Sequence, residues 1–181
     1  MKIETTALPG VLLLTPTMYR DDRGAFSETF NLRRFAEAGL PTKWVQDNFS
    51  VSRKNVLRGI HYQIGQPQGK LVRATHGAVL DVAVDLRRGS PDFGRHVAVE
   101  LSGENGRMLW IPEGFGHAFL VLSEAAGFAY KVTDYYAPKD ERTILWSDSE
   151  IGIAWPVSAA EAVVSPKDAC GMRLREAELF P

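Results

Sequence analysis

Four side chains that could do chemistry lie close together in the segment RGIHYQIGQPQGK, residues 58–70. They are Arg58, His61, Gln63 and Lys70, placed on a strand-like stretch and a glycine-rich bend. A histidine transfers protons near neutral pH, and a lysine or arginine stabilises an anion. The segment is therefore compatible with a metal site, an anion site or a proton-transfer site.

The metal hypothesis depends on spacing. Jelly-roll metal sites of the cupin type use two histidines at i and i+2, a glutamate a few residues later, a glycine, and a histidine on a later strand. The corresponding residues here are His61, Gln63, Lys70, Gly77 and His117. An amide replaces one ligand, and a protonated lysine has no lone pair to donate to a cation. The spacing predicts a cupin-like fold, whereas the side chains argue against a metal.

Proton transfer is the second hypothesis, with His61 as the general base. Asp168, in the segment SPKD, is a candidate partner for the imidazole, although only the fold could bring it across 107 residues of chain. Tyr130 could supply an acid and Lys70 could stabilise an oxyanion. From spacing alone, a core histidine and a packing tyrosine remain the more common outcome.

Anion and ring binding is the third hypothesis. Residues 19–30 combine arginines suited to a phosphate with a phenylalanine suited to stacking, and residues 44–50 add polar side chains. Such segments are often solvated loops, and the aspartates next to the arginines partly cancel the positive charge of residues 19–30. The candidates in these two segments are Arg20, Arg23, Phe26, Glu28, Gln46 and Asn48.

Short strands separated by turns must position these side chains. Residues 78–86 alternate between two faces, and residues 117–123 and 127–137 have similar patterns. Residues 96–112 contain two strand-like runs around Asn105-Gly106, which predicts a hairpin. Eight or more such strands predict a β-sandwich or barrel whose interior could hold a small ligand.

Helical signals are few. Residues 31–40 have apolar side chains at helical spacing and Gly39 as a C-terminal cap, and residues 148–150 open a short helix or turn. We expect a mainly β, cupin-like jelly roll with a few short helices. In that fold the pocket-facing residues would be His61, Gln63, Lys70, His117 and Tyr130.

Composition narrows the class of protein. The chain has 181 residues, 45% of them hydrophobic and 24% charged, which predicts one domain over residues 1–181. A net charge of −1 argues against a large basic surface for nucleic acid. Cys170 is the single cysteine, and the apolar run Val11–Leu14 is too short for a signal peptide or membrane span. We therefore expect a cytoplasmic protein with no membrane contact.

Seven segments together resemble one family, the dTDP-4-dehydrorhamnose 3,5-epimerases. Their order and spacing match that family across nearly the whole chain, which makes proton transfer the preferred hypothesis. The segments are DDRGAFSETF, QDNFSVSRKNVLRGIHYQ, GKLVRATHGAVLDVAVDLRRGSPDFG, LWIPEGFGHAFLVLSE, YKVTDYYAPKDERTILWSD, IAWP and SPKDA.

The resemblance implies a cupin-like homodimer without a metal or organic cofactor, acting on a dTDP-4-keto-6-deoxyhexose. It implies inversion at C3 and C5 through an enolate, with His61 as base, Asp168 as its partner, Tyr130 as acid and Lys70 beside the enolate oxygen. Part of each active site, particularly around Arg23, would come from the partner subunit. Residues at substrate-contact positions are Arg23, Phe26, Glu28, Gln46, Asp47, Asn48, Arg58, His117, Tyr136, Glu141 and Lys167.

Several points stay open. A C3-only epimerase, a ketoisomerase, a metal-dependent cupin oxygenase and a non-catalytic binding barrel could all share this scaffold. Arg58 should face away from His61 on a regular strand, so it reaches the same pocket only if the strand bulges. The family more often has Ala then Gly where this chain has Gly116 and Ala118, a swap of small residues from which we expect little effect.

Overall fold

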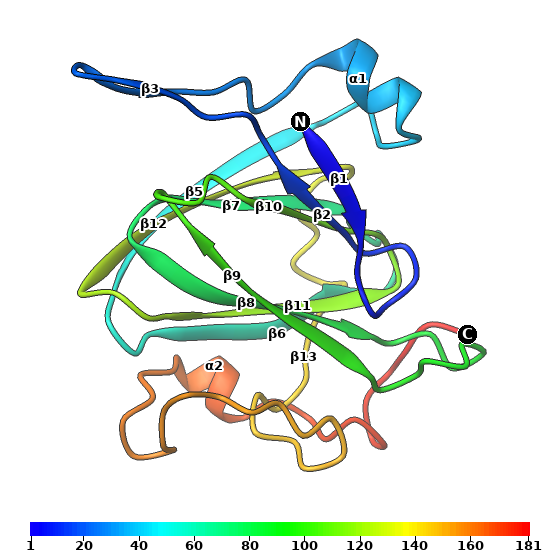
Figure 1. Ribbon diagram of the computed structural model, residues 1–181. Helices are drawn as coiled ribbons and strands as arrows, with labels where there is room; N and C mark the ends of the chain where they lie inside the picture. The colour runs from blue at the N-terminus through cyan, green and yellow to red at the C-terminus, as the bar shows by residue number, and fades with distance from the viewer.

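The computed structural model describes residues 1–181 and consists mainly of antiparallel strands in two facing sheets (Figure 1). One sheet has the order β1 (Lys2–Thr5), β2 (Leu12–Thr15), β10 (Met108–Ile111), β7 (Lys70–His76), β12 (Ala125–Val132), β5 (Gln46–Arg53). The other has the order β13 (Glu141–Thr143), β6 (Leu57–Gln63), β11 (Phe115–Val121), β8 (Ala78–Asp85), β9 (His96–Ser102). The prediction of a mainly β jelly roll is confirmed.

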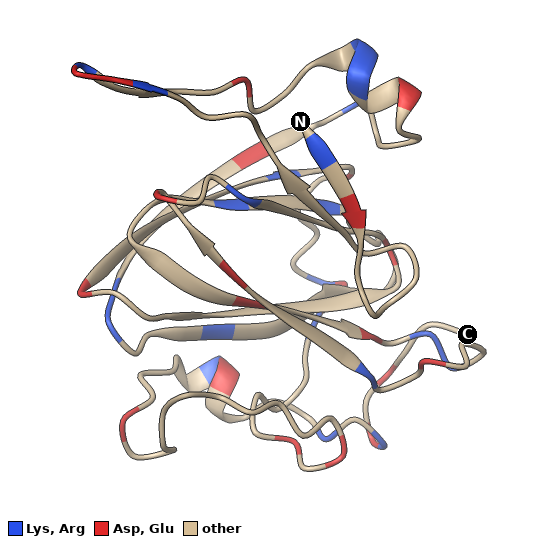
Figure 2. Cartoon of the chain, in the orientation of Figure 1, with Lys and Arg blue, Asp and Glu red and all other residues tan.

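Four further elements lie outside these sheets. Strands β3 (Tyr19–Asp21) and β4 (Gly24–Phe26) form a small hairpin, here called the arm, which projects away from the sheets (Figure 1). The helices are α1 (Leu32–Glu37) and α2 (Pro166–Ala169). No helix in the chain has the length and apolar character that crossing a membrane requires. Basic and acidic residues are interspersed over the elements (Figure 2).

The main core lies between the inner faces of the two sheets. Phe119 from one sheet stacks on Phe128 from the other, with ring centroids 4.1 Å apart. Val72 and Leu109 are completely buried in the same cluster. Because each fully buried side chain of this size contributes about 1.5–3 kcal/mol, this cluster holds the sheets together.

Strand β8 is buried on both faces. Its inner residues Val79 and Ala83 belong to the main core, while Val82 and Val84 face the opposite way. The outer face is covered by the C-terminal segment, residues 144–181, which runs beneath the five-stranded sheet (Figure 1). Within that segment, buried Asp148 accepts hydrogen bonds from the backbone N–H groups of Glu150 and Leu174.

The expected hairpin at residues 96–112 is wrong. Strand β9 pairs with β8, whereas β10 pairs with β2 and β7, so the chain crosses from one sheet to the other between them. Only Gly106 of the Asn-Gly pair has a positive φ, and Asn105 instead accepts hydrogen bonds from the backbone of Ser102 and Arg107. All of β10 is buried, and its two neighbours supply the hydrogen bonds that both of its edges need.

The predicted helix near residue 35 is confirmed as α1. The Asn31 side chain caps it by accepting from the Arg34 backbone N–H at 3.2 Å, and Gly39 follows it with a φ of 69°. Phe35 is completely buried and meets Phe30 with ring centroids 4.8 Å apart. The helix thereby covers the outer face of the six-stranded sheet.

The swapped pair Gly116 and Ala118 generates a prediction about packing. A Cβ on Gly116 would lie 2.5 Å from Ile60 Cγ2 and 2.9 Å from Leu86 Cδ1, and both neighbours are completely buried. Gly116→Ala should therefore lower the free energy of unfolding by about 1–3 kcal/mol, measured by urea denaturation. Ala118→Gly in the same protein should restore part of the loss, because it vacates space in the buried cluster that also contains Ile60. If the stability changes of the two single variants simply add in the double variant, this account is contradicted.

Candidate active site

A cavity of about 310 Å³ lies between the two sheets. Five strands contribute to it, namely β5, β6, β7, β11 and β12, and it brings together six of the residues that the sequence singled out. Its lining consists of Asn48, Phe49, Ser50, Arg58, His61, Lys70, His117, Phe119 and Tyr130.

His61 meets Asp168 at this cavity, with Nε2 2.5 Å from Oδ1. Ser165 caps the short helix α2 by accepting from the Asp168 backbone N–H, which places the carboxylate beneath β6. Asp168 is 2% exposed. Burial opposes its ionisation, but the hydrogen bond and charge of His61, with help from Ser165 and Lys167, hold its pKa below the ordinary value. The pair is a carboxylate–imidazole dyad, the arrangement that orients a general base.

Lys70 places a buried ammonium beside the dyad. Its Nζ reaches from the six-stranded sheet to within 3.5 Å of the backbone oxygen of His61 on the facing sheet. Burial lowers the pKa of Lys70 to about 8, while the negative charges of Asp81 and Glu141 act in the opposite direction. Such a group can stabilise negative charge that develops in the cavity.

His117 is held by a carboxylate that the sequence analysis did not select. Its Nε2 lies 2.9 Å from Oδ2 of Asp81, and its ring stacks on Phe128. Burial lowers the pKa of His117 despite the opposing effect of Asp81. The available signal was an aspartate between Val79 and Ala83 on one face of an alternating strand, because a buried carboxylate there needs a partner.

Arg58 lines the cavity because β6 bulges. In the pairing of β6 with β11, His61 faces His117 but Arg58 faces Phe119, so β6 has one more residue than its partner in this interval. The bulge reverses the alternation that would have turned Arg58 away. Its guanidinium donates to Ser52 Oγ at 3.1 Å.

Tyr130 comes from β12, where it is opposite Asn48 on β5. Burial raises the pKa of its phenol, so the hydroxyl keeps its proton at neutral pH. Tyr130 belongs to the six-stranded sheet and His61 to the five-stranded sheet. The cavity thus contains a protonated hydroxyl and an imidazole supplied by different walls.

Tyr136, Glu141 and Lys167 form a hydrogen-bonded cluster near the dyad. The Glu141 carboxylate accepts from the Tyr136 hydroxyl at 2.9 Å and from Lys167 Nζ at 2.8 Å. Burial would raise the pKa of Glu141, but these two hydrogen bonds and the charge of Lys167 lower it. Gln46 extends the cluster, because it accepts from the Tyr136 backbone N–H and donates to Asn48.

The arm does not reach the cavity of its own chain. Arg23 forms an exposed ion pair with Asp21, and Phe26 is 71% exposed. Glu28, just beyond the arm, bonds Arg34 and Asn31 at the start of α1. The structure therefore leaves three of the expected substrate-contact residues, Arg23, Phe26 and Glu28, apart from His61.

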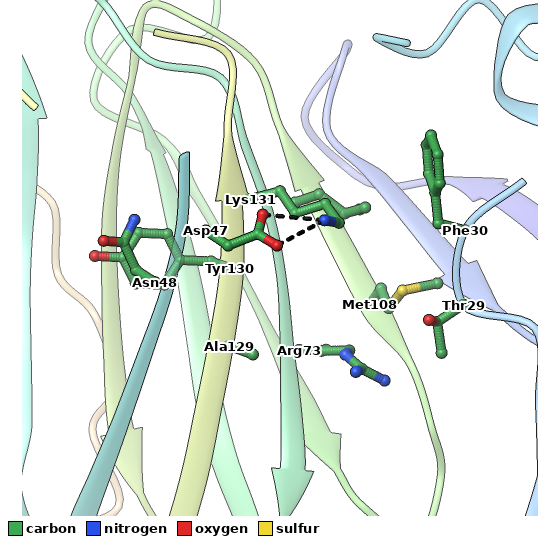
Figure 3. A pocket seen from close by; sticks show the side chains of 10 residues that line it. Thr29, Phe30, Asp47, Asn48, Arg73, Met108, Ala129, Tyr130 and Lys131 are labelled. Carbon is green, nitrogen blue, oxygen red and sulfur yellow. Dashed lines mark hydrogen bonds and ion pairs between the residues drawn. The ribbon is translucent and has the colours of Figure 1, made fainter. Parts of the chain in front are cut away.

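Asp47 faces a different hollow. It pairs with Lys131 at 2.9 Å on the outer face of the six-stranded sheet, beside a hollow of about 360 Å³ (Figure 3). Thr29 and Phe30 form the opposite wall of that hollow. The hollow lacks the dyad and Lys70, so we assign the chemistry to the inner cavity.

Gln63 also differs from expectation, because it does not line the cavity. It is buried, and its amide bonds the backbone of Gln66, Tyr135 and Ala137. Its role is to hold the loop that follows β12. No group of three or more His, Cys, Asp or Glu side chains is arranged as metal ligands.

The lowered pKa of Lys70 makes a prediction about stability. The folded protein gives up this proton near pH 8, whereas the unfolded chain holds it to about 10.4, so folding suffers the full cost below pH 8. Lys70→Met should raise the free energy of unfolding at pH 7 by roughly 3 kcal/mol, and the gain should vanish above about pH 10.5. Urea denaturation at both pH values measures it.

Lys54→Met is the matched control for this prediction. Lys54 pairs with Glu124 on the surface, so its replacement should change the free energy of unfolding by no more than about 1 kcal/mol at either pH. A Lys70→Met protein less stable than the parent at pH 7 would contradict the assigned cost of burial.

Comparison with known proteins identifies relatives of the whole chain. The family model described as dTDP-4-dehydrorhamnose 3,5-epimerase matches residues 5–176. A protein of that name from Pseudomonas aeruginosa is 55% identical, and the match covers 100% of both chains.

Two solved structures extend the comparison. The Legionella pneumophila dTDP-6-deoxy-D-glucose-3,5-epimerase in complex with dTDP-4-keto-L-rhamnose superposes with a TM-score of 0.94 at 49% identity, covering 98% of this chain and 94% of that one. A 3'-monoepimerase from Streptomyces bikiniensis in complex with dTDP-quinovose has a TM-score of 0.88 at 35% identity, covering 94% and 86%. These likenesses confirm the cupin-like fold. The chain belongs to the dTDP-4-dehydrorhamnose 3,5-epimerase family.

Proposed function

We propose that this protein inverts C3 and C5 of dTDP-4-keto-6-deoxyglucose to give dTDP-4-keto-L-rhamnose. The observation that supports this most directly is the His61–Asp168 dyad beside the buried ammonium of Lys70. The 3,5-epimerase from Legionella pneumophila, whose structure contains dTDP-4-keto-L-rhamnose, gives the substrate class.

His61 acts as the base. The C4 ketone acidifies the hydrogens on C3 and C5, because each carbanion delocalises onto the ketone oxygen. The Asp168 carboxylate can only accept, so it fixes the proton of neutral His61 on Nε2 and leaves the lone pair on Nδ1. Asp168 then stabilises the imidazolium that forms when the substrate proton is taken.

Lys70 and Tyr130 complete the reaction. The ammonium of Lys70 stabilises the enolate oxygen, and its charge acts strongly because it is buried away from bulk water. Tyr130, from the other sheet, returns a proton to the opposite face of the sugar ring. Removal on one face and return on the other invert the carbon. No redox change takes place.

The nucleotide occupies the polar groups around the cavity. Arg58 and Lys167 suit the diphosphate, since both are cations beside the dyad. Tyr136 is half exposed and can stack on thymine. The remaining contacts that we assign to the substrate are Gln46, Asn48, His117 and Glu141.

The site is completed by a second copy of the chain. The arm projects from its own barrel and carries exposed Arg23 and Phe26, which have no role in that barrel's cavity. In a homodimer these residues, with Glu28, would reach the partner's cavity and contact the nucleotide. Exposed Phe49 and Val51 along the edge strand β5 supply apolar surface for such an interface.

A C3-only epimerase is the second candidate, supported by the likeness to the 3'-monoepimerase from Streptomyces bikiniensis. Both reactions would use His61 and the enolate at C3. They differ in whether the ring is also deprotonated at C5, so the two are distinguished by where solvent hydrogen enters.

The double inversion makes a prediction about hydrogen exchange. With the keto-sugar nucleotide in D₂O, the intact protein should incorporate deuterium at both C3 and C5, measured by proton NMR. His61→Ala should lose exchange at both carbons, by about 10²–10⁴-fold, because the base is gone. Exchange at C3 alone would show that the protein is a single-position epimerase. Movement of the carbonyl group along the sugar would show that it is a ketoisomerase. The absence of exchange at both carbons would refute both epimerase proposals.

The shared site makes a prediction about mixed dimers. Arg23→Ala and His61→Ala proteins should each be nearly inactive. After the two are unfolded together and refolded, mixed dimers should contain one site with an intact base and an intact arm. Random pairing should then restore about a quarter of the parent activity. Mixtures that stay as inactive as the separate variants would show that Arg23 does not act across the dimer.

A further inference from the structure

Asp81 is a buried carboxylate that the proposed mechanism does not use. Strand β8 places it on the inner face between Val79 and Ala83, both completely buried in the apolar core. Asp81 itself has no exposed surface. A carboxylate in such a place is costly unless it is compensated by partners of opposite charge or by hydrogen bonds.

One oxygen of Asp81 has a partner and the other does not. Oδ2 accepts from His117 Nε2 at 2.9 Å, while Oδ1 is buried without a hydrogen bond. A neutral His117 satisfies the first oxygen but cannot balance the charge. The balancing charge must therefore come from another group inside the barrel.

Lys70 is the matching cation. It is buried, and its Nζ has one long hydrogen bond, at 3.5 Å to the His61 backbone oxygen. Among the surrounding charges, Asp81 acts on it more strongly than Glu141 does. Glu141 is already bonded to Lys167 at 2.8 Å, which leaves Asp81 as the counter-charge for the ammonium.

No other group around Lys70 replaces Asp81 as its counter-charge. The neighbouring strands and helix contribute two histidines, a tyrosine, cations and the carboxylates already paired elsewhere. These titratable and charged groups, besides Asp81, are Arg58 and His61 on β6, His117 on β11, Tyr130 on β12, Glu141 on β13, and Lys167 and Asp168 on α2.

We infer that Asp81 is a positioning residue for the epimerase: its Oδ2 fixes His117 with the proton on Nε2, and its charge keeps the buried Lys70 protonated inside the barrel. This inference rests on the proposed function, because it gives Lys70 the enolate oxygen to stabilise. An uncharged lysine would lose most of that ability.

Asp81→Asn separates the two parts of this role. The amide oxygen can still accept from His117 Nε2, so the ring keeps its place while the charge disappears. Without the charge, Lys70 loses its proton at lower pH, by about one unit or more. The alkaline limb of kcat/KM for deuterium exchange at C3 should move toward acid by the same amount, because kcat/KM reports the free enzyme.

The ratio of variant to parent gives the sharpest readout. We expect kcat/KM of Asp81→Asn to be about fivefold below the parent at pH 8 and within about twofold of it at pH 6, since a one-unit shift from pH 8 leaves Lys70 mostly deprotonated at pH 8. Asp85→Asn is the matched control. Asp85 is equally buried on the same face of β8, but it pairs with Arg87 outside the cavity, so its loss should not move the alkaline limb.

Two results would overturn the inference. One is a ratio that stays constant with pH. The other needs only the parent protein: ¹³Cε NMR of Lys70 showing an uncharged side chain at pH 6.5 would refute it even if Asp81→Asn failed to fold. If the parent protein catalyses deuterium exchange at neither C3 nor C5, the proposed function itself fails. This result is distinct from a failure of the inference about Asp81.

Discussion

The charge of Lys70, buried inside the barrel, is the constraint on which the rest of the site depends. Burial lowers the pKa of its ammonium to about 8, and few hydrogen bonds compensate for the lost water. The same burial strengthens the charge interactions inside the barrel, because bulk water does not screen them. Burying this charge lowers the stability of the fold, but it provides a positive charge that can stabilise an enolate. The polar residues around Lys70 are arranged to keep it charged.

The C-terminal segment links this interior to the outer layer of the fold. Residues 144–181 cover the outer face of the five-stranded sheet, and the same segment places Asp168 against His61. Asp148 and the bridge between Ile144 and Met172 hold the segment in position. One stretch of chain therefore both packs against the outer face of the sheet at β6 and orients His61, the proposed base.

Local patterns predicted much of the fold, and their failures have physical causes. The alternation in residues 78–86 and the C-terminal cap at Gly39 act over a few residues, so β8 and α1 followed from them. The hairpin at residues 96–112 did not, because a strand chooses its partners by burial and by the hydrogen bonds available on both edges. Arg58 likewise reaches the cavity only because β6 bulges against β11.

The sequence by itself determined the β character, the family and the chemical types in the site, since these depend on residue identity and short-range spacing. Only the tertiary structure decided which of them meet. It brought Asp168 to His61, turned Asp47 and Gln63 to other tasks, and added Asp81 as the partner of His117. The reason is that contacts between residues far apart in the chain depend on how two sheets and a covering segment pack, and no local pattern encodes that distance.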